Sequence, residues 1–91
     1  MPYYPLEEQC AVIAYMKYRL ETPPPGQSRW DVIASKYNKT WGPLGRPRQA
    51  ASLKTLLWVQ LTSATTSPAH KDQLLVHKYN NIIANLHTTI V

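Results

Sequence analysis

Cysteine, glycine and acidic residues are scarce in this chain of 91 residues, and phenylalanine is absent. Because Cys10 is the single cysteine, no internal disulfide can stabilise the fold, and a reducing compartment is expected. The stretch Gly42-Pro-Leu-Gly45 lacks the Lys-Ser/Thr pair of a phosphate-binding loop, which argues against a P-loop nucleotide site. No apolar run approaches the roughly 18 residues that a membrane-spanning helix needs, so we expect no membrane contact.

The scarcity of acids also argues against catalysis. General acid–base chemistry needs ionisable groups that converge in a pocket. The chain has five Asp and Glu residues, and three of them, Glu7, Glu8 and Glu21, are expected on one exposed helix. We therefore predict that the protein is not an enzyme and that it has no catalytic residues.

The spacing of the three histidines argues against a metal site. His70 and His77 are seven residues apart, which is about two helical turns or ~10 Å. One zinc ion cannot bind both unless a second element supplies ligands. We expect His70, His77 and His87 to be solvated or partly packed, and Cys10 to be a packed thiol rather than a reactive one. No metal ion or cofactor is predicted.

Apolar residues recur at helical spacing in four stretches, so the sequence predicts an all-α protein. The nine aromatic rings, three Trp and six Tyr, are expected to supply much of its core, because a chain this small needs them to offset the entropy lost on folding. Prolines between residues 21 and 26 end the first helix. The predicted helices cover residues 6–20, 29–38, 47–61 and 68–91.

The first predicted helix shows an apolar stripe. Leu6, Cys10, Ile13 and Leu20 recur at helical spacing, so we expect this stripe to face the core.

The second predicted helix begins with a capping signal. Ser28 is a natural N-cap, and Asp31 three positions later completes a variant of the capping box. The residues expected on its buried face are Trp30, Ile33, Ala34 and Tyr37.

The third predicted helix has a broad apolar face. Leu53, Leu57 and Leu61 recur at four-residue steps, and Leu56 and Trp58 widen the stripe. Either the core is large or part of this face is exposed for binding.

Residues 63–67 are small and polar, which predicts a linker between a domain at 1–62 and an amphipathic helix at 68–91. An apolar seam on this helix can pack back on the first three helices or on a second copy of the chain, and both alternatives are open. The chain stops directly after this helix, which suggests the front part of a longer protein. The seam consists of Leu75, Tyr79, Ile82, Leu86 and Ile90.

Positive charge is concentrated between residues 29 and 54, where six of the ten basic residues face a single acid, Asp31. The formal net charge of the whole chain is +5. Concentrated positive charge favours an anionic partner, most often nucleic acid. The cations either form ordinary solvated faces on separate elements or join in one patch. They are Arg29, Lys36, Lys39, Arg46, Arg48 and Lys54.

Tyr4, Trp30 and Trp58 stand at matched places in the first three predicted helices, so that three rings can meet at the centre of a small bundle. Four segments share an order and spacing with a known pattern: Tyr4-Pro-Leu-Glu-Glu-Gln9, Ile13-Ala-Tyr15, Arg29-Trp-Asp-Val-Ile-Ala34, and Arg46-Pro-Arg-Gln-Ala-Ala-Ser-Leu53 running on to Trp58. In these segments the chain resembles the Myb/SANT-like helix-turn-helix family, particularly the small Myb-like domains of filamentous fungi.

The resemblance covers about residues 1–61 and implies a three-helix Myb-like bundle whose third helix enters the major groove of double-stranded DNA. It implies a DNA-binding module of a transcription or chromatin regulator. By carry-over, Arg46 and Arg48 would contact phosphates, while Gln49, Ser52, Lys54 and Thr55 would lie nearest to base edges. With the remaining cations of the basic window, the expected DNA-binding residues are Arg29, Lys36, Lys39, Arg46, Arg48, Gln49, Ser52, Lys54 and Thr55.

One departure from the fungal pattern supports an alternative. Where the pattern places Lys or Arg two residues before the last aromatic, this chain has Leu56. Apolar surface there suits a partner protein better than a phosphate, and SANT-type relatives often bind proteins. The alternative is therefore a protein-interaction or self-association module that uses Leu56, Trp41 and the seam of the helix at 68–91.

The N-terminal sequence MPYYPLEEQ has acids where a secretion signal carries basic residues followed by an apolar stretch. We expect the cytosol or nucleus by default, and the DNA-binding interpretation selects the nucleus.

Overall fold

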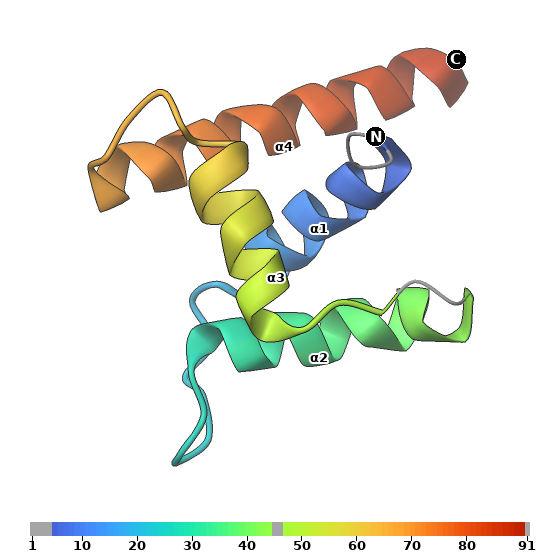
Figure 1. The fold of residues 1–91 in the computed structure, drawn as a ribbon. Coiled ribbons are helices and arrows are strands. Elements are labelled where there is room, and N and C mark those ends of the chain that lie inside the picture. The colour runs from blue at the N-terminus through green and yellow to red at the C-terminus, as the bar shows by residue number, and fades with distance from the viewer. Residues whose placement is uncertain (1–4, 45–46, 91) are drawn as a thin grey trace.

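The computed structural model describes residues 5–44 and 47–90, with side chains described for 6–43 and 47–85, and these residues form helices and no strand. The expected all-α fold is confirmed. Figure 1 shows α2 and α4 at opposite ends of α3, with α1 between them. The elements in chain order are α1 (Pro5–Tyr18), α2 (Arg29–Trp41), the 3-10 turn η1 (Gly42–Leu44), α3 (Ala50–Lys54), the π-helical segment η2 (Thr55–Gln60) and α4 (Pro68–Ile90).

Helix α1 contacts α2, α4 and η2. Its buried face is formed by Ala11, Val12 and Tyr15, all fully buried, whereas Leu6 is 51% exposed. The prediction that the apolar stripe of this helix faces the core was therefore wrong for Leu6, whereas Cys10 is partly buried against the core cluster, as expected of a packed thiol. The reason is that α1 is apolar on more than one side, so periodicity alone does not choose which side meets α2 and α4. Leu20 lies beyond the end of the helix and is 79% exposed.

Helix α2 begins at the predicted capping box. The Ser28 Oγ accepts a hydrogen bond from the Asp31 N–H at 3.3 Å, and an Asp31 carboxylate oxygen accepts one from the Ser28 N–H at 2.8 Å. The helix runs three residues beyond the expected end, because Trp41 is buried and its ring stacks on Tyr37 with centroids 6.1 Å apart. Trp41 is therefore a core residue that is 5% exposed, with only a small part reaching the surface, and not the exposed contact residue that the protein-interaction alternative expected.

The third helix begins at Ala50, three residues later than expected, and its second half is π-helical. A characteristic i to i+5 hydrogen bond links the Leu61 N–H to the Leu56 carbonyl at 2.9 Å. Leu53, Leu56 and Leu57 are all buried. The broad apolar face therefore belongs to a large core, and Leu56 does not offer apolar surface to a partner.

Three aromatic rings meet at the centre of the bundle. The ring centroids of Tyr15 and Trp30 are 5.8 Å apart, those of Tyr15 and Trp58 are 5.9 Å apart, and those of Trp30 and Trp58 are 5.6 Å apart. These distances are typical of favourable aromatic pairs. The cluster uses two of the three expected residues, Trp30 and Trp58, while Tyr4 lies outside the described residues.

Helix α4 folds back along α1. Leu75 is fully buried, and Tyr79 and Ile82 are partly buried against the same core cluster. The predicted seam therefore packs within the chain over this part of α4; the side chains of Leu86 and Ile90 lie outside the described ones. Within the residues that the structure describes, no helix combines the length and the hydropathy needed to span a membrane.

Polar contacts fix α4 in this position. The Tyr15 hydroxyl donates to Asp72 Oδ1 at 2.6 Å, and the Arg19 guanidinium donates to both Asp72 carboxylate oxygens at 3.0 Å. The Lys71 ammonium donates to the carbonyl oxygen of Trp58 at 2.7 Å, where the end of η2 leaves acceptors without helical partners.

Candidate nucleic-acid interface

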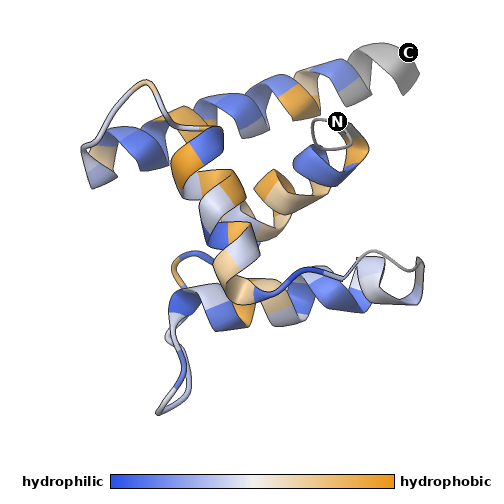
Figure 2. Ribbon diagram, in the orientation of Figure 1, coloured by the Kyte–Doolittle hydropathy of each residue, from blue (hydrophilic) through white to orange (hydrophobic). Residues whose placement is uncertain are grey.

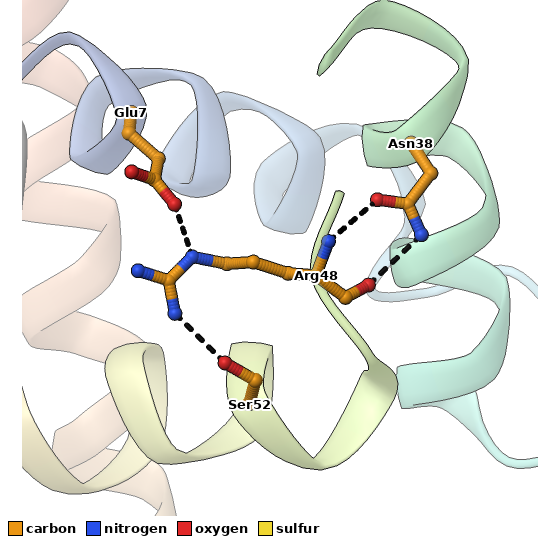
Figure 3. Close-up of polar contacts among 4 residues, drawn as sticks. All are labelled: Glu7, Asn38, Arg48 and Ser52. Atoms are coloured by element: carbon orange, nitrogen blue, oxygen red, sulfur yellow. Dashed lines mark hydrogen bonds and ion pairs between the residues drawn. The ribbon is translucent and has the colours of Figure 1, made fainter. Parts of the chain in front are cut away.

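The junction between α2 and α3 is closed by the side chain of Asn38. Its amide nitrogen donates to the Arg48 carbonyl oxygen at 2.8 Å, and its amide oxygen accepts from the Arg48 N–H at 2.9 Å. Both polar backbone groups of Arg48 are therefore satisfied by one side chain of α2 (Figure 3). This pair of hydrogen bonds sets where the chain enters α3.

The side chain of Arg48 connects α1 to α3. Its Nε donates to Glu7 Oε1 in an ion pair, and its Nη1 donates to Ser52 Oγ at 2.8 Å (Figure 3). The Glu7 residue is only 7% exposed, so the expectation that it lies on an exposed helix surface was wrong. A carboxylate this buried needs a charged partner, and Arg48 is that partner. The positive charge expected to meet a phosphate is thus balanced by an acid.

The remaining expected base-edge residues lie in and beside α3: Gln49 precedes it as the N-cap residue, Lys54 ends it and Thr55 begins η2. Gln49, Lys54 and Thr55 are exposed, as is Ala51 between them. Ala51, Lys54 and Thr55 are three and four residues apart and so share one side of the helix. The Thr55 hydroxyl donates to the Ala51 carbonyl at 3.0 Å. Ser52 is only partly exposed and is engaged by Arg48.

The expected cations on α2 do not all lie beside α3. The Lys36 ammonium lies over the ring of Tyr18 in α1, 5.4 Å from its centroid. Asn38 follows two residues later, about 200° further around the helix, and faces Arg48. Lys36 and Arg48 therefore belong to different surfaces of the molecule. Arg29 and Lys39 are exposed on α2, and Arg46 lies outside the described residues.

Two buried tyrosines lie beside acids of the bundle, Tyr37 near Glu7 and Tyr15 against Asp72. Burial raises the pKa of Tyr37, and the nearby negative charge of Glu7 raises it further. Burial likewise raises the pKa of Tyr15, and its hydrogen bond to Asp72 adds to the shift. Both phenols therefore stay protonated well above physiological pH.

Sequence reasoning missed the two residues that organise the site, Glu7 and Asn38. Their partner, Arg48, is 41 residues from Glu7 and 10 residues from Asn38 along the chain, and no local pattern reports such contacts. One signal was present. Glu7 stands four and eight residues before Ala11 and Tyr15, so it shares their side of α1 and would require a cation if that side is buried.

Among the side chains described, those of residues 6–43 and 47–85, no three His, Cys, Asp or Glu residues are grouped closely enough to hold a metal ion. The side chains of His70 and His77 are exposed, and that of His87 is not among those described. No protein-family model, curated protein or solved structure matches the chain.

Proposed function

We propose that the protein is a DNA-binding module of the helix-turn-helix type, in which the outer face of α3 enters the major groove. One observation supports this most directly: Asn38 fixes the start of α3 through both backbone groups of Arg48, while Gln49, Lys54 and Thr55 stay exposed. A reading helix has to be rigidly held on its inner side and open on its outer side. The resemblance to Myb/SANT-like domains and the net charge of +5 support the same proposal.

The proposed roles differ from a simple basic patch. Arg48 and Ser52 position α3, because the guanidinium is already paired with Glu7 and bonded to the serine hydroxyl. Lys54 is the cation on the reading face, and Gln49 and Thr55 are the neutral side chains placed to meet base edges. A regulator of this kind would act in the nucleus, on chromatin or at promoters.

The number of available cations sets the expected salt dependence. If Lys54, Arg29 and Lys39 each meet a phosphate, the slope of log K against log[salt] is about −3. This is a weak electrostatic contribution, so binding to random duplex DNA is expected to be measurable at ~50 mM salt and largely lost at ~200 mM.

The test is a fluorescence-anisotropy titration of a labelled random-sequence duplex at several salt concentrations. Lys54→Ala should weaken binding to every duplex and make the slope less steep by about one unit. The matched control is Lys78→Ala, because Lys78 lies on α4, away from the reading face. Absence of binding at ~50 mM salt, or equal effects of the two variants, would exclude the proposed interface.

A further inference from the structure

One side of α1 borders a groove between α1 and α2 through Cys10, Ile13 and Ala14. Cys10 and Ile13 are three residues apart and half-buried, and Cys10 also packs against the core cluster. Figure 2 shows hydrophobic colours along much of α1. A helix that is apolar on two sides is normally covered on both. In this molecule α4 and η2 cover one side, and the groove leaves the other accessible.

The groove has an apolar floor and a volume of about 260 Å³. Cys10 and Ile13 of α1 and Tyr37 and Trp41 of α2 form much of the floor. Sites for small organic ligands usually span roughly 300–1,000 Å³, so this groove suits one or two side chains of a partner better than a whole ligand. A partner inserting apolar side chains would meet a rigid surface, because Trp41 and Tyr37 stack on each other.

Two lysines stand at the mouth of the groove, one from each helix. The ammonium groups of Lys17 and Lys36 lie 5.8 Å and 5.4 Å from the centroid of the same Tyr18 ring. They are therefore within about 11 Å of each other. Among the described residues that line the groove there is no acid. In the described part of the chain neither lysine forms a salt bridge, and two like charges near one ring favour an anionic partner group, because a cation–π contact orients an ammonium without neutralising it.

We propose that this groove binds an acidic amphipathic helix of a partner protein. Two apolar side chains of the partner, at i and at i+3 or i+4, insert between α1 and α2, and flanking Glu or Asp side chains pair with Lys17 and Lys36. Nucleic acid would also meet the two lysines, but the buried floor of aliphatic, thiol and indole groups offers little to phosphates. The groove lies on the side of α2 that carries Lys36, whereas the DNA-facing proposal uses the side that carries Asn38. Both partners can therefore bind at once.

The test uses the full chain and a synthetic helical peptide of about 16 residues with Leu on one face and Glu on the other. Titration followed by amide NMR should give saturable shifts at Cys10, Ile13 and Lys36. Because Cys10 is the single cysteine and lines the groove, bound peptide should also slow its alkylation several-fold. A peptide with Lys in place of every Glu should bind at least tenfold more weakly.

Charge-reversal variants distinguish this proposal from non-specific hydrophobic binding. Lys17→Glu and Lys36→Glu should each lower the affinity for the acidic peptide by about tenfold and should raise the affinity for the basic peptide. The matched control is Lys39→Glu, an exposed residue of the same helix that does not line the groove. Lys54→Ala should leave peptide binding unchanged, so failure of DNA binding and failure of peptide binding are separate results. Three results would overturn the proposal. They are the absence of saturable binding of the acidic peptide below ~1 mM, equal affinities for the two peptides, and displacement of the acidic peptide by a single-stranded oligonucleotide.

Discussion

The amide of Asn38 binds the backbone of Arg48 through both of its polar atoms, at 2.8 Å and 2.9 Å. This contact joins the last turn of α2 to the segment that leads into α3. The described residues between η1 and α3, 47–49, form no helix of their own. The orientation of α3 therefore depends on one side chain as well as on the leucine core.

We predict that Asn38→Ala lowers the free energy of unfolding by about 1–3 kcal/mol, because two partly buried backbone groups lose their partner. Chemical denaturation followed by circular dichroism measures the change. DNA affinity at a temperature where the variant is folded should also fall, since the start of α3 is no longer fixed. Asn80→Ala, at an exposed position of α4, serves as the control and should change neither quantity.

Arg48 should behave as a positioning residue and not as a phosphate contact. Arg48→Gln leaves Glu7 buried without its charged partner, and we expect a loss of about 2–3 kcal/mol of stability; this is below the value for a fully buried pair because the arginine side chain keeps 23% exposure. Adding Glu7→Gln should recover part of that loss, and the double-mutant cycle measures the coupling. At the DNA level, the salt slope of Arg48→Gln should equal that of the parent. A slope less steep by about one unit would show that the guanidinium contacts a phosphate after all.

Stability should fall in alkaline solution as the tyrosines titrate. The pKa of Tyr15 is raised by burial and by the hydrogen bond to Asp72, so above about pH 10 the unfolded chain releases a proton that the folded chain retains. The contribution of this group is complete below that pH and is lost as the pH rises, at up to about 1.4 kcal/mol per pH unit. Tyr37 adds a second such loss. Urea denaturation at pH 8 to 11 should show a shallower decline for Tyr15→Phe than for the parent, and identical declines would contradict the assignment.

The capping box at Ser28 should be worth about 1 kcal/mol, because its hydroxyl satisfies the Asp31 N–H at the start of α2. Ser28→Ala removes that acceptor, and thermal unfolding should register the loss. Ser63→Ala, at an exposed position after η2, is the matched control. Equal unfolding temperatures for Ser28→Ala and the parent would mean that the exposed cap contributes nothing.

Much of the secondary structure follows from local rules that the sequence displays. The Ser28–Asp31 pair predicted the start of α2, and the proline-rich segment predicted the end of α1. The apolar positions of α2 predicted Ile33, Ala34 and Tyr37 of its buried face, but not the burial of Val32 on the other side of the helix. Local chemistry decides these features, so a single sequence suffices for them.

The orientation of α1 and the organisation of the site could not be predicted in this way. An apolar stripe through Cys10 and a second one through Ala11 and Tyr15 are both compatible with burial, and only the positions of α2 and α4 decide between them. The roles of Glu7 and Arg48 likewise depend on a contact across 41 residues. Charge counting treated Arg48 as available to a ligand because the sequence does not show which cations are already paired.

The position of α4 bears on how the chain should be divided for expression. Leu75 completes the core that the first three helices share, and Asp72 holds the hydroxyl of Tyr15 and the guanidinium of Arg19. A fragment that stops at residue 62 would expose apolar surface on α1 and leave those two side chains without their acceptor. Recombinant fragments of this protein should therefore extend at least beyond Ile82, so that they include the part of α4 that packs on the core.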